Sequence, residues 1–269
     1  MIDQDTQYAY KIFLNAALPL VKVIAGDIPA LAKKFEKAHC IYQVSALDPD
    51  APEGKVATHF TVNNGEWKVC ADHVATNAMV ELQFKSIDAF VGFFKGQMSP
   101  ATLPKMKGAI KHLPMFLAFM QVLLKMSALL GAKAPPEDEE TKILLVKCFF
   151  YLLSSGISCL NKNGQEAIHG WALASPDRVY SWAVDGHPEV AAYIRVKAGK
   201  SRAGRGEYKR AMPFFTLRFD CLDSALGILM STDDMMDATK AGRLIMDGAP
   251  EFGAQLGDFM LTVAAYAQG

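Results

Sequence analysis

Apolar and polar residues change their spacing in the same order in the two halves of the chain. Apolar residues first recur at helical spacing, over residues 6–24 and again over 141–160, which predicts one opening helix in each half. Asp27 and Pro29 predict the start of a second helix in the first half. Alternation with a period of two follows and predicts strands. The predicted strands are 41–44, 56–62, 66–70 and 79–84 in the first half, and 179–184, 189–196, 201–205 and 214–219 in the second.

Each half then continues with a short helix, a helix that carries methionines, an edge strand and a closing helix. The short helices are 86–94 and 221–229, and the edge strands are 109–112 and 243–247. Asp88 and Asp223 recur at the strand-to-helix turn, so we expect them to be N-caps. Asn63-Asn64-Gly65 and Ala198-Gly199 predict hairpin turns. The pattern predicts an α+β protein with a small, mostly antiparallel sheet covered by helices in each half.

The second half also repeats parts of the amino-acid sequence of the first. Leu82, Phe84 and Asp88 recur 135 residues later as Leu217, Phe219 and Asp223. The offset drifts only between about 134 and 136 along most of the chain, which indicates an internal duplication. Pro135 and Pro136 cannot continue a helix and mark the boundary. We therefore predict two domains, 1–134 and 135–269.

The amino-acid sequence of residues 217–261 resembles that of the sterol-carrier-protein type 2 (SCP2) family. The matching segments are Leu217-Arg218-Phe219-Asp220, Asp223-Ser224-Ala225-Leu226, Met235-Met236-Asp237-Ala238, Gly242-Arg243-Leu244-Ile245-Met246-Asp247-Gly248 and Phe252-Gly253-Ala254-Gln255-Leu256. The first half departs from the family pattern, because its edge strand lacks the terminal glycine. The resemblance implies two SCP2-like domains, each with a hydrophobic tunnel between sheet and helices that holds a fatty acyl chain, acyl-CoA, phospholipid or sterol.

The closing helices supply most of the expected ligand-binding side chains. In the second half, apolar residues recur three or four positions apart, as an amphipathic helix requires. The first-half helix, 113–130, is apolar almost all round and leaves only Ala118, Gln121 and Lys125 as a narrow stripe. The expected ligand-binding residues are Phe252, Leu256, Phe259, Met260, Val263, Met230 and Met246 in the second half, and Met115, Phe116, Phe119, Met120 and Leu123 in the first.

Two other functions fit the same pattern. The helix 113–130 could be covered by the other domain, a lipid or a second chain, so the protein could be an interaction or dimerisation module. The basic hairpin 195–210 could hold the phosphates of acyl-CoA in an accessory domain of a lipid enzyme, or contact an anionic membrane. It could equally be a solvated strand edge guarded against aggregation.

Composition narrows the choice of partners and of compartment. Lys plus Arg equals Asp plus Glu at 28 each, which argues against nucleic acid as a partner. Five cysteines without a CxxC pair predict reduced thiols rather than disulfides or a metal site. The acidic N-terminus and Pro19 do not fit a signal peptide, so a cytoplasmic protein is expected. Residues 113–130 and 143–160 approach the length of a membrane span but carry polar residues, and we expect soluble helices.

The sequence offers no catalytic motif. It contains no GxSxG elbow, no HExxH pair and no complete phosphate-binding loop, because Ile194 stands where that loop before Gly199-Lys200-Ser201 needs its first glycine. The six histidines are scattered and none lies four residues from another, so we expect structural roles for them. We therefore expect lipid binding and transport without catalytic residues, metal or cofactor.

Overall fold

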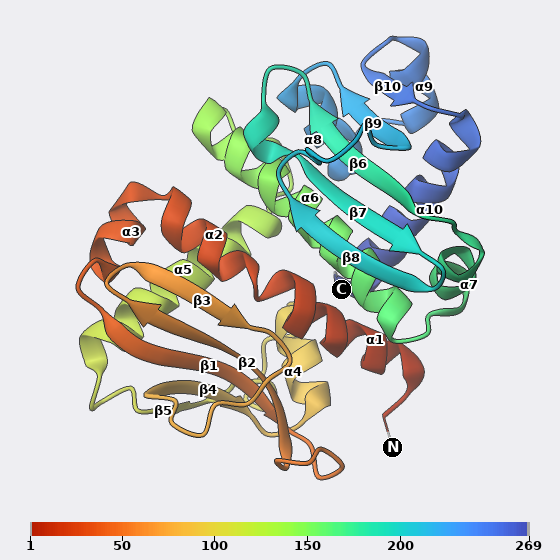
Figure 1. Cartoon of the computed structure of the whole chain (residues 1–269). Coiled ribbons are helices and arrows are strands. Elements are labelled where there is room, and N and C mark those ends of the chain that lie inside the picture. The colour runs from red at the N-terminus through yellow and green to blue at the C-terminus, as the bar shows by residue number, and fades with distance from the viewer. Residues whose placement is uncertain (1, 268–269) are drawn as a thin grey trace. The chain divides into compact units, whose positions relative to one another are not determined.

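The computed structural model describes residues 2–267, and the chain divides into two compact units (Figure 1). Unit 1 runs to Ala128 and also takes in the C-terminal end from Ala265, and unit 2 is Leu129–Ala264. Each unit contains one five-stranded sheet and helices, so the predicted α+β class is confirmed.

The middle strand of the unit 1 sheet has one antiparallel neighbour and one parallel neighbour. Its strands are β1 (His39–Leu47), β2 (Lys55–Asn63), β3 (Glu66–Cys70), β4 (Val80–Phe84) and β5 (Lys105–Lys107). Its helices are α1 (Gln4–Ile12), a π-helical turn (Phe13–Ala17), α2 (Leu20–Asp27), α3 (Pro29–Phe35), α4 (Ile87–Phe94) and α5 (Leu113–Leu130). The strand order is β3-β2-β1-β4-β5, and only the pair β1 and β4 is parallel.

Unit 2 has the same strand order with the same parallel pair at its centre. Its strands are β6 (Arg178–Val184), β7 (Ala192–Lys197), β8 (Lys200–Arg205), β9 (Phe215–Phe219) and β10 (Leu244–Asp247), in the order β10-β9-β6-β7-β8. Its helices are α6 (Glu139–Lys162), α7 (Glu166–Ala174), a 3-10 turn (Pro188–Val190), α8 (Leu222–Leu229), α9 (Met235–Lys240) and α10 (Pro250–Ala267). β6 and β9 are the parallel pair.

The strand registers of the two units also agree. Tyr42 on β1 pairs with Phe60 on β2 and with Val80 on β4. Tyr180 on β6 pairs with Ile194 on β7 and with Phe215 on β9. The offsets of 134 and 135 residues that the sequence predicted for β2 and β4 are therefore the offsets of the paired strands.

Both predicted hairpin turns are confirmed by their backbone angles. Asn64 and Gly65 have φ of 49° and 78°, and Ala198 and Gly199 have φ of 44° and 82°. Two successive residues with positive φ give a turn whose twist matches that of the flanking strands. Glycine adopts these angles without strain, whereas Ala198 holds its Cβ in a region that non-glycine residues rarely enter.

The predicted edge strand of unit 1 was wrong, because the strand is Lys105–Lys107 and residues 109–112 follow it. Gly108 ends the strand at φ +72°, where an added Cβ would overlap the Met79 carbonyl oxygen. The methionine-bearing helix is present only in unit 2, as α9. In unit 1 the corresponding segment contains Gly96, Pro100 and Pro104, which do not favour a helix.

Three further details differ from the prediction in unit 2 and at the helix starts. Pro188 opens a 3-10 turn, so β7 begins at Ala192 rather than at residue 189, and α7 was not predicted. The N-cap of α4 is Ser86, whose Oγ accepts a hydrogen bond from the Ala89 backbone N–H. Cys221 holds that position before α8. The aspartates two residues later lie in the first helical turn, where carboxylates favour the helix dipole.

Three helical stretches are long and apolar enough to cross a membrane by length and composition. They are Gln4–Asp27, Leu113–Leu130 and Glu139–Lys162, with 78%, 28% and 83% of their apolar windows buried. The first and the third are thus mostly enclosed by the protein itself, whereas α5 is mostly exposed.

Candidate functional site

Helix α5 covers the face of the unit 1 sheet on which Tyr42 lies. Phe119 of α5 stacks on Tyr42, with ring centroids 4.5 Å apart and planes inclined by 14°. The same phenylalanine lies 5.9 Å from Phe60 on the neighbouring strand. Trp67 stacks on Tyr42 at 5.9 Å, and Phe35 of α3 meets it edge-on at 6.2 Å. Tyr42 is therefore enclosed by aromatic rings from two helices and one strand, and its side chain has no exposed surface.

Unit 2 surrounds Tyr180 in the same manner beneath α10. Trp171 of α7 lies 5.2 Å from the Tyr180 ring, and Phe252 of α10 lies 6.2 Å from it. Trp171 also packs against Phe259 of α10 at 5.1 Å. Tyr180 is 1% exposed. The closing helix and the central strand of each unit thus meet through aromatic side chains.

The hydroxyl groups of these two tyrosines have no hydrogen-bond partner. Among the buried side-chain nitrogen and oxygen atoms of residues 2–267, Tyr42 Oη and Tyr180 Oη are the ones without one. A buried polar group left without a partner costs about 1–3 kcal/mol, so such groups are rare in folded proteins. The same cost is borne at the same register position in both units. A polar group of a bound molecule would remove it.

Tyr42 and its neighbour Cys40 are both neutral groups in this environment. Burial raises the pKa of the Tyr42 phenol far above its usual range, and the charge and hydrogen bonding of the neighbouring Cys40 thiol add to the rise. A thiol is a weak hydrogen-bonding group, and its geometry towards Tyr42 Oη does not make a regular hydrogen bond. Burial likewise raises the pKa of the Cys40 thiol. The Tyr42 hydroxyl therefore keeps its proton and can donate a hydrogen bond.

The residues predicted to bind ligand lie on α5 and α10, except for Met230 at the end of α8 and Met246 on β10. Leu256, Phe259, Met260, Val263 and Phe119 are buried, and Phe252, Met230, Met246, Met115, Phe116, Met120 and Leu123 are half-buried. Trp182 Nε1 donates to the Met260 sulfur at 3.4 Å, which joins β6 to α10. Met246 of β10 packs on α10 at Gly253, where an added Cβ would lie 2.5 Å from its sulfur. Their role in ligand binding, and the tunnel itself, remain predictions.

Sequence reasoning missed the aromatic residues of the strands. Tyr42, Tyr180 and Trp182 lie within predicted strands, and Trp171 lies on the helix that was not predicted. A signal was present, because a tyrosine follows an aliphatic residue at the same place in Ile41-Tyr42 and Val179-Tyr180. The prediction for α5 was also wrong in one respect, because Ala118 is buried and does not belong to the exposed stripe.

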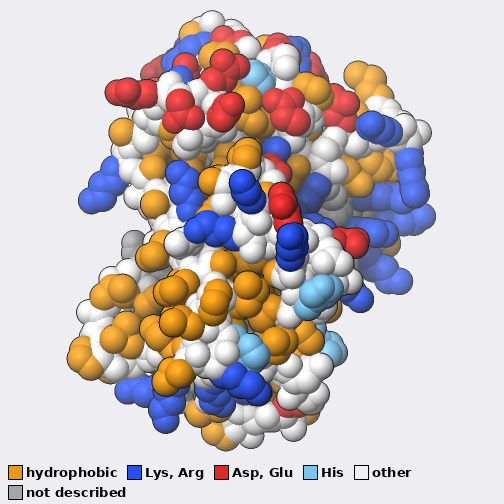
Figure 2. Space-filling view, turned by 90° about the vertical axis from the view of Figure 1, so that its left-hand side faces the viewer, with side chains coloured by type: hydrophobic (Ala, Val, Ile, Leu, Met, Phe, Trp, Pro, Cys, Tyr) orange, Lys and Arg blue, Asp and Glu red, His pale blue; other side chains and the backbone are white. Residues whose placement is uncertain are grey.

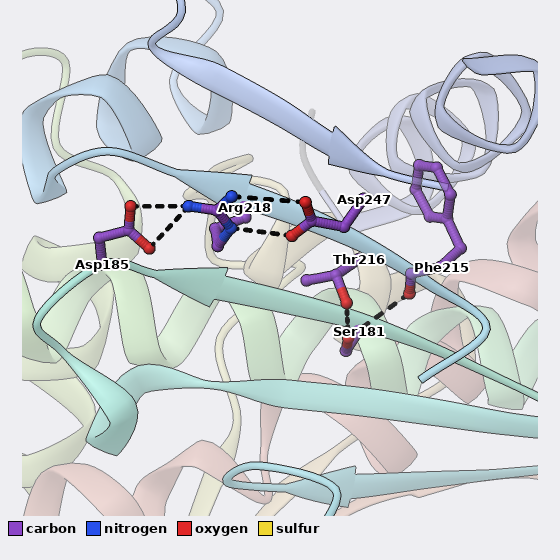
Figure 3. A network of polar contacts seen from close by, with 6 residues as sticks. All are labelled: Ser181, Asp185, Phe215, Thr216, Arg218 and Asp247. Atoms are coloured by element: carbon purple, nitrogen blue, oxygen red, sulfur yellow. Dashed lines mark hydrogen bonds and ion pairs between the residues drawn. The ribbon is translucent and has the colours of Figure 1, made fainter. Parts of the chain in front are cut away.

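The opposite face of the unit 2 sheet carries a closed polar network (Figure 3). Arg218 Nη1 donates to Asp185 Oδ2 at 2.8 Å, and Arg218 Nε donates to Asp247 Oδ2 at 2.8 Å. The carboxylate of Asp247, followed by that of Asp185, raises the pKa of Arg218. Beside it, the Ser181 and Thr216 hydroxyls lie 2.7 Å apart. Two carboxylates already neutralise the guanidinium, so this network ties β9 to β10 and does not favour an anion.

The unit 1 sheet carries a buried carboxylate on its corresponding face. Glu81 Oε1 accepts hydrogen bonds from Lys55 Nζ at 2.7 Å, Ser45 Oγ at 2.7 Å and Gln43 Nε2 at 2.8 Å. Burial alone would raise the pKa of Glu81, but these bonds lower it to about 2. Lys107 Nζ lies 3.5 Å from the other carboxylate oxygen, so side chains of unit 1 neutralise Glu81 on both oxygens.

The basic hairpin is less charged than its sequence indicates. Asp177, just before β6, accepts two hydrogen bonds from Arg195 at 2.7 and 2.6 Å and lies 3.4 Å from Lys197 Nζ. The Arg195 hydrogen bonds and the Lys197 charge hold the pKa of Asp177 at about 2. The sequence had shown only Glu207 opposing these cations. The structure adds a second carboxylate and therefore favours the solvated edge over a phosphate site.

Within residues 2–267, no group of three or more His, Cys, Asp or Glu side chains is arranged to hold a metal ion. His59 and His73 do lie together, although the sequence separates them, with ring centroids 5.3 Å apart. His59 Nδ1 lies 2.8 Å from the His73 carbonyl oxygen, which ties the loop after β3 to β2.

Neither a protein-family model nor a curated protein sequence matches the chain. Among solved structures, the chain is similar to a sterol carrier protein 2 at 16% identity and a TM-score of 0.32, covering 43% of this chain and 95% of that one. A hypothetical protein of Thermus thermophilus, described as a possible sterol carrier protein, matches at 20% identity and a TM-score of 0.30, covering 42% and 85%. The sec-alkylsulfatase Pisa1 from Pseudomonas sp. matches at 14% identity and a TM-score of 0.25, covering 66% and 30%.

Proposed function

We propose that each unit binds a lipid between its sheet and its closing helix and carries it without chemical change. The observation that supports this most directly is the pair of buried, unpartnered hydroxyls of Tyr42 and Tyr180, which recur at one register position. We propose that each hydroxyl donates to a polar group of the ligand, such as a carboxylate, an ester carbonyl or a sterol hydroxyl.

The surroundings of the two hydroxyls suit the apolar part of such a ligand. Aromatic rings and methionines lie between sheet and helix, and methionine adapts its shape to irregular neighbours. Burial of a chain gains about 0.8 kcal/mol per methylene group, so a long acyl chain alone could support tight binding. The side chains of α10 and α5 predicted from the sequence would form the outer wall.

We further propose that the two units are a tandem duplication of one SCP2-like domain in a cytoplasmic carrier. The sequence offset of 134 to 136 residues agrees with equal strand order and equal register in the two sheets. A tunnel that opens by movement of the closing helix would admit the ligand. The polar clusters of the sheets each have internal partners, which favours a carrier over an enzyme.

The first experiment is native mass spectrometry of the gently purified protein, followed by organic extraction and lipid analysis. A stoichiometric lipid supports the proposal, and one or two molecules per chain would distinguish one working unit from two. Leu256→Asp should abolish uptake of an added fatty acid, whereas Lys200→Ala, on the exposed hairpin, should not. An empty protein that also refuses fatty acid, acyl-CoA and sterol would overturn the proposal.

A second candidate function, as an interaction module, has one specific observation in its favour. Leu113, Leu117 and Leu124 of α5 are each at least half exposed.

A further inference from the structure

Helix α5 has two apolar faces with different surroundings. Phe119 and Val122 are fully buried and face the unit's own interior, where Phe119 meets Tyr42 and Phe60. The other face exposes Leu117 and Leu124, whose side chains are 50% and 63% accessible. One face of α5 is therefore committed to the sheet, and only the second is available to something outside the chain.

The exposed apolar face continues into the segment that leads to α5. Ile110 is 96% exposed, and Met106 on β5 and Leu113 at the start of α5 are about half exposed. We call this set the α5 surface; it consists of Met106, Ile110, Leu113, Leu117 and Leu124. Figure 2 shows hydrophobic side chains gathered on the face of unit 1 that it displays, with lysines at the borders. Exposed apolar side chains that form one contiguous set mark an interaction site more often than scattered ones do.

The segment that carries the α5 surface is basic. No Asp or Glu occurs between Asp88 and Glu137, and the stretch contains Lys95, Lys105, Lys107, Lys111, Lys125 and Lys133. Lys107 shares the carboxylate of Glu81 at 3.5 Å and still exposes half of its side chain. Lys105, Lys111 and Lys125 are exposed. Leucines and an isoleucine on a segment that carries lysines and no acidic residue match the composition of a helix that lies in the interface of an anionic membrane.

We propose that the α5 surface docks unit 1 on an anionic lipid membrane, with α5 lying in the plane of the interface. The buried face argues against a membrane span, because crossing a bilayer would strip Phe119 from the sheet. The charge argues against a second copy of the chain, because a two-fold dimer would join the same basic patch of both copies and bring lysines near lysines. Anionic headgroups satisfy the lysines while the leucines enter the acyl boundary.

The corresponding helix of unit 2 lacks this combination and supplies a matched control. The exposed side of α10 includes Leu261, which is 65% exposed, but also Glu251 and Asp258. Acidic side chains on the same face oppose an anionic surface. A glutamate introduced at Leu261 should therefore leave membrane binding unchanged, although Leu261 is as exposed as Leu124.

The test is flotation of the full chain with vesicles of phosphatidylcholine, with or without phosphatidylserine. We expect the protein to float with the vesicles that contain phosphatidylserine, and the double variant Leu117→Glu/Leu124→Glu to remain at the bottom of the gradient. The variant Lys105→Ala/Lys111→Ala should lower the partition coefficient of the protein into the vesicles about fivefold per lysine. Added salt should also lower this coefficient, because it screens the lysine charges. Leu261→Glu should float like the unchanged protein.

Since Leu117 and Leu124 are exposed, unchanged thermal unfolding of the double variant should exclude misfolding as the cause. Failure of the unchanged protein to bind phosphatidylserine vesicles would overturn the proposal. So would equal binding to both kinds of vesicle, or equal loss in Leu261→Glu. Sedimentation as a dimer that the double variant abolishes, without vesicle binding, would identify the α5 surface as a contact between copies instead.

Discussion

Phe119 of α5 stacks on Tyr42 of β1 at 4.5 Å, and the hydroxyl that the ring helps to bury has no partner of its own. Stability alone does not explain a tyrosine at this position, because a phenylalanine at position 42 would keep the ring contacts and remove the unsatisfied oxygen. Tyr180 beneath α10 presents the same conflict. Retention of a costly group where a cheaper one would pack equally well points to a use for the hydroxyl.

The first prediction concerns these hydroxyls. Tyr42→Phe and Tyr180→Phe should each raise the free energy of unfolding of the ligand-free protein by about 1 kcal/mol, because each removes a buried unsatisfied group. Each should also weaken fatty acid binding to its unit by about tenfold, because the ligand loses one hydrogen bond.

Urea unfolding and isothermal titration calorimetry would measure the two effects. Tyr208→Phe is the control, because Tyr208 is half-buried near Tyr193 and is not among the unpartnered side chains. Weaker unfolding stability together with unchanged lipid affinity would mean that the hydroxyls are structural.

The second prediction uses the tryptophans. The chain has three, Trp67 in the unit 1 cluster and Trp171 and Trp182 in the unit 2 cluster, and each lies close to a closing helix or its aromatic partners. A lipid that enters either unit should therefore change tryptophan emission. In Trp67→Phe the signal should report unit 2, and in Trp171→Phe/Trp182→Phe it should report unit 1. Stoichiometric lipid uptake without any change in emission would place the ligand elsewhere.

The third prediction concerns pH. Glu81 is 6% exposed, and its pKa of about 2 in the folded protein lies below its ordinary value of 4.5. A lowered folded-state pKa stabilises the protein fully above pH 4.5, and this contribution is lost as the pH falls from 4.5 towards 2. The loss should be about 3 kcal/mol. Unfolding free energies of the unchanged protein and of Glu81→Gln should therefore converge over this range, and parallel curves would contradict the assignment.

The fourth prediction concerns the Arg218 clamp. Arg218→Leu should destabilise unit 2 by about 1–2 kcal/mol, because it leaves Asp185 and Asp247 facing each other without the cation, partly screened by water. The effect should be local, with faster hydrogen exchange at the amides of Leu244–Asp247 on β10. Lys240→Leu is the control, because its ion pair with Asp237 is exposed on both sides. Equal exchange in the two variants would show that β10 is held by its backbone alone.

The sequence was informative where local chemistry decides the structure. Hairpin turns, the opening and closing helices and most strands followed from periodicity and turn residues, because these depend on neighbours in the chain. The edge strand of unit 1 was misplaced because its end depends on a contact between residues that are far apart in sequence. A Cβ at position 108, where the strand ends, would overlap the Met79 carbonyl oxygen. The N-caps shifted for a simpler reason, because Ser86 and Cys221, not the aspartates, hold the extended backbone before the helix.

The candidate site was harder to predict, because burial and pairing are tertiary properties. Phe119, Leu256 and Phe259 were expected near a ligand because they lie on the closing helices, beside which the SCP2 resemblance implies a tunnel, and all three are buried. Nothing local shows that the Tyr42 and Tyr180 hydroxyls lack partners, or that Asp177, just before β6, pairs with Arg195 on β7. Charge along the hairpin was therefore overestimated, and the tyrosines were overlooked.

The parallel pairing of β1 with β4, and of β6 with β9, has a consequence for the order of folding. In each unit the hairpin strands meet through short loops, whereas the middle strand gains its parallel partner only after the chain has passed through the whole hairpin. Long closures cost more chain entropy and form later. The strand that bears the tyrosine is thus flanked on both sides only at a late stage, so a nascent unit should acquire lipid after, and not during, the assembly of its hairpin.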